Sequence, residues 1–459
     1  MSLTATLSFH GAARGVTGSC YHLQVGDEAV VIDCGTFQGD RDDEARNRAP
    51  FGFAPEGVAA LILTHGHLDH VGRSPLLVKR GFAGQILGHA ATLEIASIIL
   101  DDSAKIANHA DDEPLYDADD VEATKALMRP IRAYRAATVV GRFTIELFDA
   151  GHILGSSSVR VSWRDGSTSR AVLFSGDLGV AGAPILRDPF TAWDPVADAV
   201  DVVVTESTYG DRTHPARAEV RTNLRRIVER AIADGGKVLI PAFSIGRTQE
   251  VLYELNTMIE AGELPGIPVV VDGPLGLSAT RIYSRHRELY DTEAMARLER
   301  GDHPLEFDGL VNARDPQASR RAVDLDGPAI IIAGSGMCQG GRIRHHLQRH
   351  LPDARTDVLL VGYQAFRTLG RALQDGRDTI YLRGEEIPVR ARISTISGLS
   401  AHADRDGLTA WFAAIPRRPD ARVFVTHGEE DQARAYASRL HDKFAVRTDV
   451  PAFEQAITL

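Results

Sequence analysis

The sequence contains few cysteines and no long hydrophobic run. Only three of its 459 residues are cysteine, which is too few for a disulfide framework or for a cluster of thiolates around a metal. No stretch approaches the roughly 18 consecutive apolar residues that a membrane-spanning helix needs. The first residues also lack the basic and then apolar pattern of a secretory leader. We therefore expect a cytoplasmic protein with no membrane partner.

The chain also lacks an excess of positive charge. Its 51 Lys and Arg residues are outnumbered by 62 Asp and Glu residues, so the net charge is -11. Such a charge does not attract nucleic acid over long distances, and a nucleic-acid partner would have to be held by a local basic patch or by bound metal ions. The length exceeds what one hydrophobic core usually organises, so we expect two or three domains.

The order of strand-like and helix-like segments divides the chain into three parts. Short strand-like runs separated by glycine-rich turns dominate residues 1–208. Strands and helices alternate over residues 209–390, which is typical of a parallel, doubly wound sheet. Residues 391–459 then return to strand, polar loop, helix and strand. We predict an α/β protein.

A dense group of possible metal ligands follows the apolar run AALIL. Residues 64–70 read Thr-His-Gly-His-Leu-Asp-His, which places four candidate ligands within six positions. If this segment is a turn leaving a strand, His65 and His67 can converge on one ion while Asp69 and His70 point to a second ion. The spacing therefore predicts two metal ions. The alternative is a polar turn whose histidines are surface groups.

Four further candidate ligands lie just past apolar runs and close to glycine: Asp33, His152, Asp177 and His427. Taken singly, each has an ordinary alternative as a turn former or a hydrogen-bonded polar residue. Taken together they complete a two-metal site in which Asp177 lies between the ions and Asp33 orients a ligand from behind. The predicted ligand sets are His65, His67 and His152 for one ion, and Asp69, His70 and His427 for the other. Imidazole and carboxylate ligands without thiolate suit two Zn²⁺ ions, and Mn²⁺ also fits them.

This ligand pattern resembles that of the metallo-β-lactamase fold. The resemblance rests on the run from His65 to His70 together with the later His152, Asp177 and His427. It implies a four-layer αββα sandwich that binds metals along one sheet edge. It does not identify the substrate, because lactamases, thioesterases and nucleases share this fold.

The last ligand candidate indicates an inserted domain. His427 lies 250 residues beyond Asp177, and a loop of that length is implausible in a compact domain. We therefore predict that residues 209–390 form a domain inserted between residues 1–208 and 391–459, with a cleft between the two domains.

Motifs on both sides of the insertion resemble those of the β-CASP family of nucleic-acid-processing enzymes. They are TESTYGD at 205–211 and SAHAD at 400–404, and PAFSIGRTQE at 241–250 and AGSGM at 333–337 match within the insertion. The similarity is closest to bacterial RNA-processing members, which are related to the nuclease subunit of the cleavage and polyadenylation specificity factor. The resemblance implies that the insertion is a β-CASP α/β domain with a mostly parallel sheet, and it suggests a homodimer.

Phosphodiester cleavage also needs an acid to protonate the departing oxygen. His402 is the candidate because imidazole titrates near neutral pH, and Glu206 is the partner that would hold it charged and oriented. We predict that a metal-bridging hydroxide attacks phosphorus and that His402 protonates the 3′ oxygen, which leaves 5′-phosphate and 3′-hydroxyl ends. The predicted catalytic residues are therefore Asp69, Glu206 and His402. The alternative is that Glu206 and His402 are polar residues at helix starts.

Glycine-rich turns in the insertion are candidates for contact with substrate phosphates. Ser335, Gly336 and Met337 follow the strand-like run AIII, where glycine allows the backbone to approach a phosphate closely. Arg247 is a candidate for the same role because its guanidinium can pair with phosphate, although a solvated helix face is the alternative.

The sequence favours a zinc-dependent ribonuclease that acts on single-stranded RNA. Internal cleavage is favoured over 5′-to-3′ trimming. The alternatives are a DNA nuclease of the same family, a non-catalytic RNA-binding scaffold and a small-molecule ester or thioester hydrolase. The complete ligand set disfavours the scaffold, and the inserted domain disfavours the small-molecule hydrolase.

Overall fold

The computed structural model describes residues 3–39, 41–107, 113–362, 364 and 367–459. The chain divides into two compact units. Unit 1 comprises Met1–Thr213 and His402–Leu459, and unit 2 comprises His214–Ala401. The insertion expected from the separation of Asp177 and His427 is therefore present, with its ends at residues 214 and 401.

The first sheet of unit 1 has seven strands, antiparallel at its start and parallel from β3 onwards. Side chains of β2 alternate between buried and more exposed positions, as expected for a sheet with one face against the core. The strands, in spatial order, are β22 (Ala456–Thr458), β1 (Ala5–Phe9), β2 (Tyr21–Val25), β3 (Glu28–Ile32), β4 (Val58–Ile62), β5 (Gln85–His89) and β6 (Met128–Ile131).

The second sheet of unit 1 also has seven strands. Strands β7 to β10 are antiparallel, and β10, β11, β20 and β21 are parallel to one another. In spatial order they are β21 (Arg447–Asp449), β20 (Arg417–Val425), β11 (Val200–Thr205), β10 (Thr168–Phe174), β9 (Ser157–Asp165), β8 (Phe143–Asp149) and β7 (Thr138–Val140).

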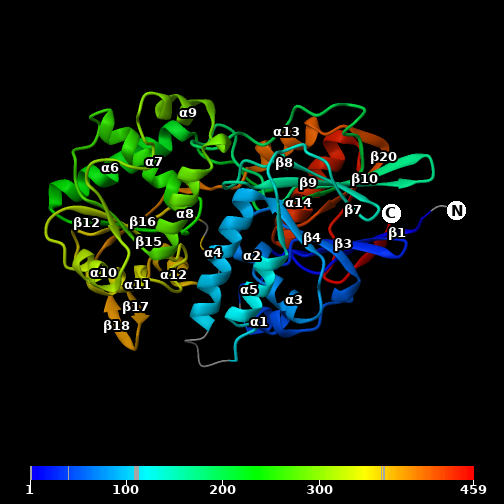
Figure 1. Cartoon of the computed structure of the whole chain (residues 1–459). Coiled ribbons are helices and arrows are strands. Elements are labelled where there is room, and N and C mark those ends of the chain that lie inside the picture. Colours follow the sequence, from blue (N-terminus) through cyan, green and yellow to red (C-terminus); the bar gives the residue numbers. More distant parts are fainter. Residues whose placement is uncertain (1–2, 40, 108–112, 363, 365–366) are drawn as a thin grey trace. The chain divides into compact units, whose positions relative to one another are not determined.

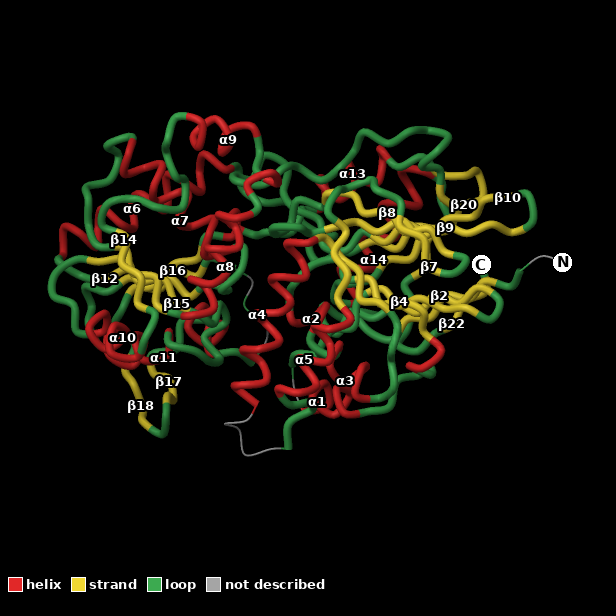
Figure 2. The backbone as a smooth tube through the Cα atoms, viewed as in Figure 1, coloured by secondary structure: helices red, strands yellow, loops and turns green. Residues whose placement is uncertain are grey.

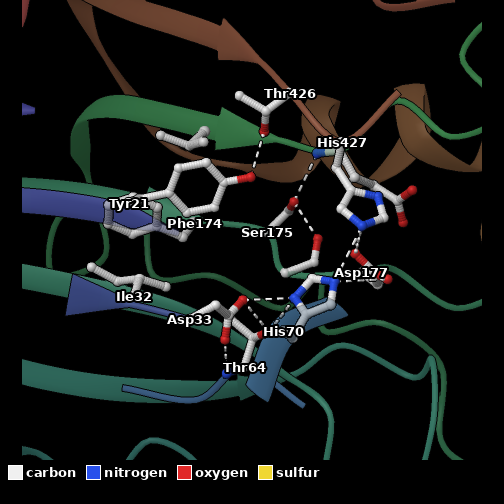
Figure 3. A pocket seen from close by; sticks show the side chains of 13 residues that line it. Tyr21, Ile32, Asp33, Thr64, His70, Phe174, Ser175, Asp177, Thr426 and His427 are labelled. Atoms are coloured by element: carbon white, nitrogen blue, oxygen red, sulfur yellow. Dashed lines mark hydrogen bonds and ion pairs between the residues drawn. The ribbon is translucent and has the colours of Figure 1, made fainter. Parts of the chain in front are cut away.

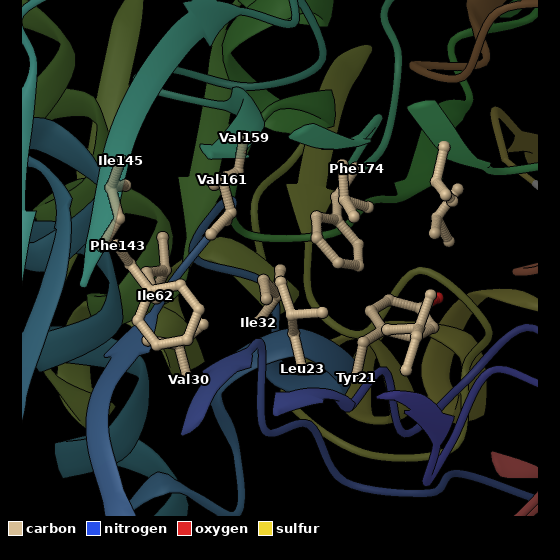
Figure 4. Close-up of a cluster of buried hydrophobic side chains, with 14 of the residues drawn as sticks. Tyr21, Leu23, Val30, Ile32, Ile62, Phe143, Ile145, Val159, Val161 and Phe174 are labelled. Atoms are coloured by element: carbon tan, nitrogen blue, oxygen red, sulfur yellow. The ribbon is translucent and has the colours of Figure 1, made fainter. Parts of the chain in front are cut away.

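The two sheets bury a shared hydrophobic core between them (Figure 4). Leu23 and Ile32 from the first sheet and Phe143 and Val161 from the second are fully buried in it. On the outer face of the first sheet, helices α4 (Ala90–Ala107) and α5 (Ala118–Leu127) pack against β5. On the outer face of the second sheet, helices α13 (Arg405–Ala414) and α14 (Glu430–Phe444) form another buried cluster with its strands. Unit 1 is thus the expected αββα sandwich (Figures 1 and 2).

Helices form the two outer layers of unit 1. In chain order they are α1 (Arg41–Arg48), the 3₁₀ turn η1 (Pro55–Gly57), α2 (Leu68–Val71), α3 (Ser74–Lys79), α4 (Ala90–Ala107), α5 (Ala118–Leu127), α13 (Arg405–Ala414) and α14 (Glu430–Phe444). Among the helices of the described residues, none is long and apolar enough to cross a membrane.

Unit 2 has a six-stranded sheet in which all paired strands are parallel. Strands β12, β13, β15 and β16 are buried along their whole length, because helices cover both faces of such a sheet. The doubly wound sheet predicted for the insertion is therefore confirmed. In spatial order the strands are β14 (Leu310–Ala313), β13 (Val269–Asp272), β15 (Ala329–Ala333), β12 (Lys237–Pro241), β16 (Asp357–Leu360) and β19 (Arg392–Thr395).

The remaining elements of unit 2 are its helices and one hairpin. The hairpin consists of β17 (Thr379–Leu382) and β18 (Glu385–Pro388). The helices are α6 (Arg217–Asp234), α7 (Arg247–Glu260), α8 (Pro274–Arg285), α9 (Thr292–Glu299), α10 (Pro316–Val323), α11 (Ile343–His350) and α12 (Leu369–Gln374), with 3₁₀ turns η2 (Arg287–Leu289) and η3 (Ser397–Leu399).

His22 in β2, and His10 directly after β1, make the stability of unit 1 depend on pH. His22 stacks on Phe53 with ring centroids 4.7 Å apart, and His10 packs edge-on against the same ring at 5.1 Å. Burial lowers the pKa of His22 to about 4, and burial together with His22 and Arg73 lowers the pKa of His10 to about 4. Both rings are therefore neutral in the folded protein at neutral pH.

We expect the free energy of unfolding to fall as the pH falls from 6.5 towards 4. The unfolded chain binds more protons in this window, because its histidines keep their ordinary pKa. The variant H22F keeps the ring stack and removes one titrating group, so it should lose about 2 kcal/mol less than the wild type between pH 7 and pH 4.5. Urea denaturation at each of these pH values, with a chelator present to remove metal ions, measures this difference. An equal loss of unfolding free energy in wild type and H22F would contradict the lowered pKa of His22.

Candidate metal centre

The histidine-rich segment leaves β4 as a short loop and then begins a helix. His65 and His67 lie on the loop, with His67 at the N-cap position of α2, and Asp69 and His70 lie in the helix itself. The helix is held from outside: the Ser19 N–H donates to the Asp69 carbonyl at 2.9 Å, and the Cys34 N–H donates to the His70 carbonyl at 2.8 Å. The predicted turn out of a strand is thus what the structure contains.

A glycine lets the loop after β3 approach this helix. A side chain at position 35 would lie 1.6 Å from the Asp69 carbonyl oxygen, so only Gly35 fits there. The close approach brings Asp33, at the end of β3, next to the His70 ring.

The other candidate ligands also follow strands of unit 1. His152 lies in the loop after β8, Asp177 follows β10, and His427 follows β20. All three are buried. Figure 3 shows Asp177 and His427 meeting His70 and Asp33, although Asp33, Asp177 and His427 follow three different strands and His70 lies in helix α2.

The ligand atoms form two neighbouring groups. One group consists of His65, His67, His152 and Asp177, and the other of Asp69, His70 and His427, with the atoms of each group within 4.8 Å of one another.

Distances within the first group are short. His67 Nδ1 lies 3.1 Å from His65 Nε2 and 3.2 Å from His152 Nε2. Asp177 Oδ2 lies 3.5 Å from His65 Nε2 and 3.7 Å from His152 Nε2. Three imidazoles and a carboxylate oxygen therefore surround one point.

Distances in the second group show the same convergence. His70 Nε2 and His427 Nε2 face each other at 3.2 Å, and Asp69 Oδ2 lies 3.6 Å from His427 Nε2. Asp177 reaches this group too, because its Oδ2 lies 3.5 Å from His70 Nε2 and its Oδ1 lies 3.6 Å from His427 Nε2. The Asp177 carboxylate is thus the group that both clusters share.

The arrangement fits divalent metal ions. Two nitrogens bound to one tetrahedral Zn²⁺ at 2.0–2.1 Å are about 3.3 Å apart, close to the separations between these rings. Asp177 Oδ1 is buried and has no hydrogen-bond donor among the described residues. Burial, together with the neighbouring His70, lowers the pKa of His65 well below its ordinary value, so that ring is in the neutral form that binds metals.

Two threonines that sequence reasoning missed support this centre. The Thr64 N–H and hydroxyl both donate to the Asp33 carboxylate at 2.8 Å, and Asp33 Oδ2 lies 2.7 Å from His70 Nδ1. Thr208 Oγ1 lies 3.1 Å from His427 Nδ1. In the sequence, these threonines are indicated only by their neighbours: Thr64 precedes His65, and Thr208 lies in the TESTYGD motif.

A second pair of ionisable side chains lies beside Asp177. His402 Nδ1 is 3.4 Å from Glu206 Oε2 and 3.8 Å from Asp177 Oδ2, and the His402 and His152 ring centroids are 4.5 Å apart. Glu206 is buried and accepts a hydrogen bond from the Leu178 N–H at 2.6 Å. Burial by itself would lower the pKa of His402, but the Glu206 and Asp177 carboxylates raise it above its ordinary value.

The candidate phosphate-binding residues belong to unit 2. Ser335, Gly336 and Met337 follow β15 at the carboxyl end of the parallel sheet, next to the loop after β12. A side chain at Gly336 would lie 2.8 Å from the Phe243 ring, so the two loops touch. Arg247 begins α7, is only 5% exposed and pairs with Glu250 one helical turn later. Its guanidinium is therefore largely covered in this structure.

We expect divalent metal to stabilise unit 1. An ion that binds only the folded state, present at 100 times its dissociation constant, adds about 2.7 kcal/mol per site. Urea denaturation with Zn²⁺ and with chelator measures this increment. Asp177→Ala should lose most of it, whereas Asp442→Asn, a change on the exposed side of α14, should keep it. An equal increment in wild type and Asp177→Ala would contradict the assignment of Asp177 as a shared ligand.

Three family descriptions match successive parts of the chain. Residues 13–242 match the metallo-beta-lactamase superfamily, residues 248–373 match the Beta-Casp domain, and residues 386–451 match the Zn-dependent metallo-hydrolase RNA specificity domain. The first match contains every candidate metal ligand except His427, which lies in the third.

Individual proteins resemble the chain over nearly its whole length. It is 39% identical to Ribonuclease TTHA0252 of Thermus thermophilus, with 94% of each chain covered, and 31% identical to Transcription termination factor FttA of Methanocaldococcus jannaschii, with 98% of this chain and 71% of that protein covered. A solved structure, titled as a protein of unknown function from Enterococcus faecalis, has a TM-score of 0.56 at 12% identity, covering 99% of this chain and 100% of that one. That likeness shows the fold alone. The chain belongs to the metallo-β-lactamase superfamily and, within it, to the β-CASP proteins.

Proposed function

We propose that the protein is a zinc-dependent ribonuclease that hydrolyses phosphodiester bonds of single-stranded RNA. The observation that carries the proposal is the cluster formed by Asp177, Glu206 and His402. It adds an acid and its partner to the two groups of metal ligands, and phosphodiester cleavage uses such an acid. The ribonuclease name of the Thermus relative and the RNA specificity description of residues 386–451 support RNA as the substrate.

The metal ligands are the seven side chains of the two groups described above. When bound, two divalent ions would lower the pKa of a water molecule and neutralise charge on the phosphate oxygens. Zn²⁺ suits the imidazole and carboxylate ligands, and Mn²⁺ is the alternative. Asp69 contributes to catalysis through its place in the second group.

His402 supplies the proton that the departing 3′ oxygen needs. Its Nδ1 faces the Glu206 carboxylate, so Nε2 carries the N–H that is donated as the phosphorus–oxygen bond breaks. Glu206 holds the ring in this orientation and favours its charged form. The products would carry a 5′-phosphate and a 3′-hydroxyl. Internal cleavage is the proposed mode, with 5′-to-3′ trimming as the alternative.

Contacts in unit 2 would hold other phosphates of the RNA. We assign this role to the backbone of Ser335, Gly336 and Met337, because glycine lets a phosphate come close to N–H donors. Arg247 belongs to the same proposal only if its pairing with Glu250 opens when RNA binds.

One experiment separates this proposal from its alternatives. Single-stranded RNA and DNA of one sequence, labelled at one end, are incubated with metal-loaded protein, chelator-treated protein and Asp177→Ala, and the product ends are mapped. We expect RNA cleavage that chelator and Asp177→Ala abolish. Cleavage of DNA in preference to RNA would favour a DNA nuclease, and RNA binding without cleavage would favour a scaffold. Hydrolysis of a thioester but of neither nucleic acid would overturn the proposal.

The role of His402 is tested by comparing rate with metal content. His402→Ala should cleave RNA on the order of 10² to 10⁴ times more slowly while retaining its metal, because a general acid contributes an effect of this size. Glu206→Gln should lower kcat and leave KM and metal content unchanged. His441→Ala, on the exposed end of α14, is the matched control and should behave as wild type. Loss of metal in His402→Ala would make His402 a ligand instead.

A further inference from the structure

The Thr208 hydroxyl contacts His427 at two atoms. It lies three residues after β11, and its hydroxyl oxygen is 3.1 Å from His427 Nδ1 and 3.1 Å from the carbonyl oxygen of the same histidine. The His427 carbonyl can only accept a hydrogen bond, whereas the hydroxyl can donate one and accept another. The hydroxyl proton therefore goes to the carbonyl, and the hydroxyl oxygen accepts from the ring N–H at Nδ1.

This arrangement decides which nitrogen of His427 is available to an ion. With a proton on Nδ1, the lone pair of the neutral ring lies on Nε2. That Nε2 atom faces His70 Nε2 at 3.2 Å and Asp69 Oδ2 at 3.6 Å. Thr208 thus turns the binding nitrogen of His427 towards the second group of ligands.

The two histidines of the second group are supported in different ways. His70 Nδ1 pairs with the buried Asp33 carboxylate at 2.7 Å, which is a charged acceptor fixed by Thr64. His427 Nδ1 instead meets the neutral hydroxyl of Thr208. A charged acceptor makes a stronger hydrogen bond than a neutral one, so His427 is the less firmly held of the two.

The backbone of His427 is also held by hydrogen bonds from neighbouring residues. His427 has a φ of 47°, in the left-handed region that side chains other than glycine seldom adopt. Its N–H donates to the Ala12 carbonyl at 2.7 Å, and its carbonyl accepts from the Ser207 N–H at 3.2 Å as well as from the Thr208 hydroxyl. Thr208 therefore contacts both the backbone and the ring of His427.

We propose that Thr208 is a positioning residue that holds His427 for the second metal ion, the ion bound by Asp69, His70 and His427. The inference rests on the proposed metal centre. It assigns to the Thr208 hydroxyl the orientation of one ring and predicts that this ion is lost first when the hydroxyl is removed. The other ion, whose ligands His65, His67 and His152 belong to the first group, should stay bound.

The experiment measures metal stoichiometry and affinity in the full-length protein. Thr208→Val keeps the size of the side chain but removes its hydroxyl, and Thr208→Ser keeps the hydroxyl. Calorimetric titration with Zn²⁺ and the visible spectrum of the Co²⁺-loaded protein measure metal binding at the two sites. Neither measurement relies on RNA cleavage. We expect two ions in wild type, 10- to 100-fold weaker binding of one ion in Thr208→Val, and wild-type binding in Thr208→Ser.

Two comparison variants complete the design. Ser207→Ala removes a neighbouring buried hydroxyl that donates to the Thr426 backbone carbonyl at 2.8 Å, so both ions should bind normally. Asp33→Asn weakens the support of His70 and should affect the same ion as Thr208→Val.

Each outcome decides something. Unchanged metal binding in Thr208→Val, equal weakening of both ions, or equal effects of Ser207→Ala and Thr208→Val would overturn the inference. A wild-type protein that binds no metal would overturn it together with the proposed metal centre. Selective loss of one ion in Thr208→Val from a protein that binds two ions but cleaves no RNA would leave the inference intact and reject the ribonuclease proposal.

Discussion

His70 and His427 are 357 residues apart in the sequence, yet their Nε2 atoms face each other at 3.2 Å in the interior of unit 1. Two imidazole nitrogens at this distance repel each other if both present lone pairs, unless a cation or a proton lies between them. The neighbouring Asp69 and Asp177 carboxylates add negative charge at the same point. The remaining features of the site follow from the need to hold these groups together against their own repulsion and desolvation.

The fold meets this need by placing ligands at strand ends and supporting them from behind. Strands buried on both faces cannot shift without exposing the core, so the loops that leave them have fixed starting points. Asp33 then contacts His70 Nδ1, Thr64 holds the Asp33 carboxylate, and Thr208 contacts His427 Nδ1. Asp33 directly follows β3, Thr64 directly precedes His65, and Thr208 lies three residues after β11, so short loops achieve this geometry.

The inserted unit begins and ends next to residues of the site. The chain leaves unit 1 shortly after Glu206 and Thr208, and it re-enters unit 1 at His402. Glu206 and His402, which we propose as the partner and the proton donor, therefore lie on opposite sides of the insertion in the sequence. The 3₁₀ turn η3 before His402 belongs to unit 2, and helix α13 after it belongs to unit 1.

Much of the metal centre was predictable from local sequence. The run from His65 to His70 has enough ligands in so few positions that its chemistry can be recognised without a fold, and His152, Asp177 and His427 each follow an apolar run as strand-end residues do. The insertion followed from the 250 residues that separate Asp177 from His427. Thr208 was not predictable in this way, because its role depends on a ring that is 219 residues later. The burial of Arg247 was also missed, although Glu250 stands three positions away and could have indicated the pairing.

The sequence by itself determined which elements form, which chemical groups line their ends and that two domains are present. These properties depend on periodicity, on glycine at turns and on the identity of neighbouring residues, all of which are local. The sequence also predicted that Asp177 lies between the two ions and that Glu206 is the partner of His402. Only the tertiary structure gave the distances of these contacts and brought Thr208 to His427. Such contacts join loops whose separation is set by how the sheets pack, and packing is a property of the whole core.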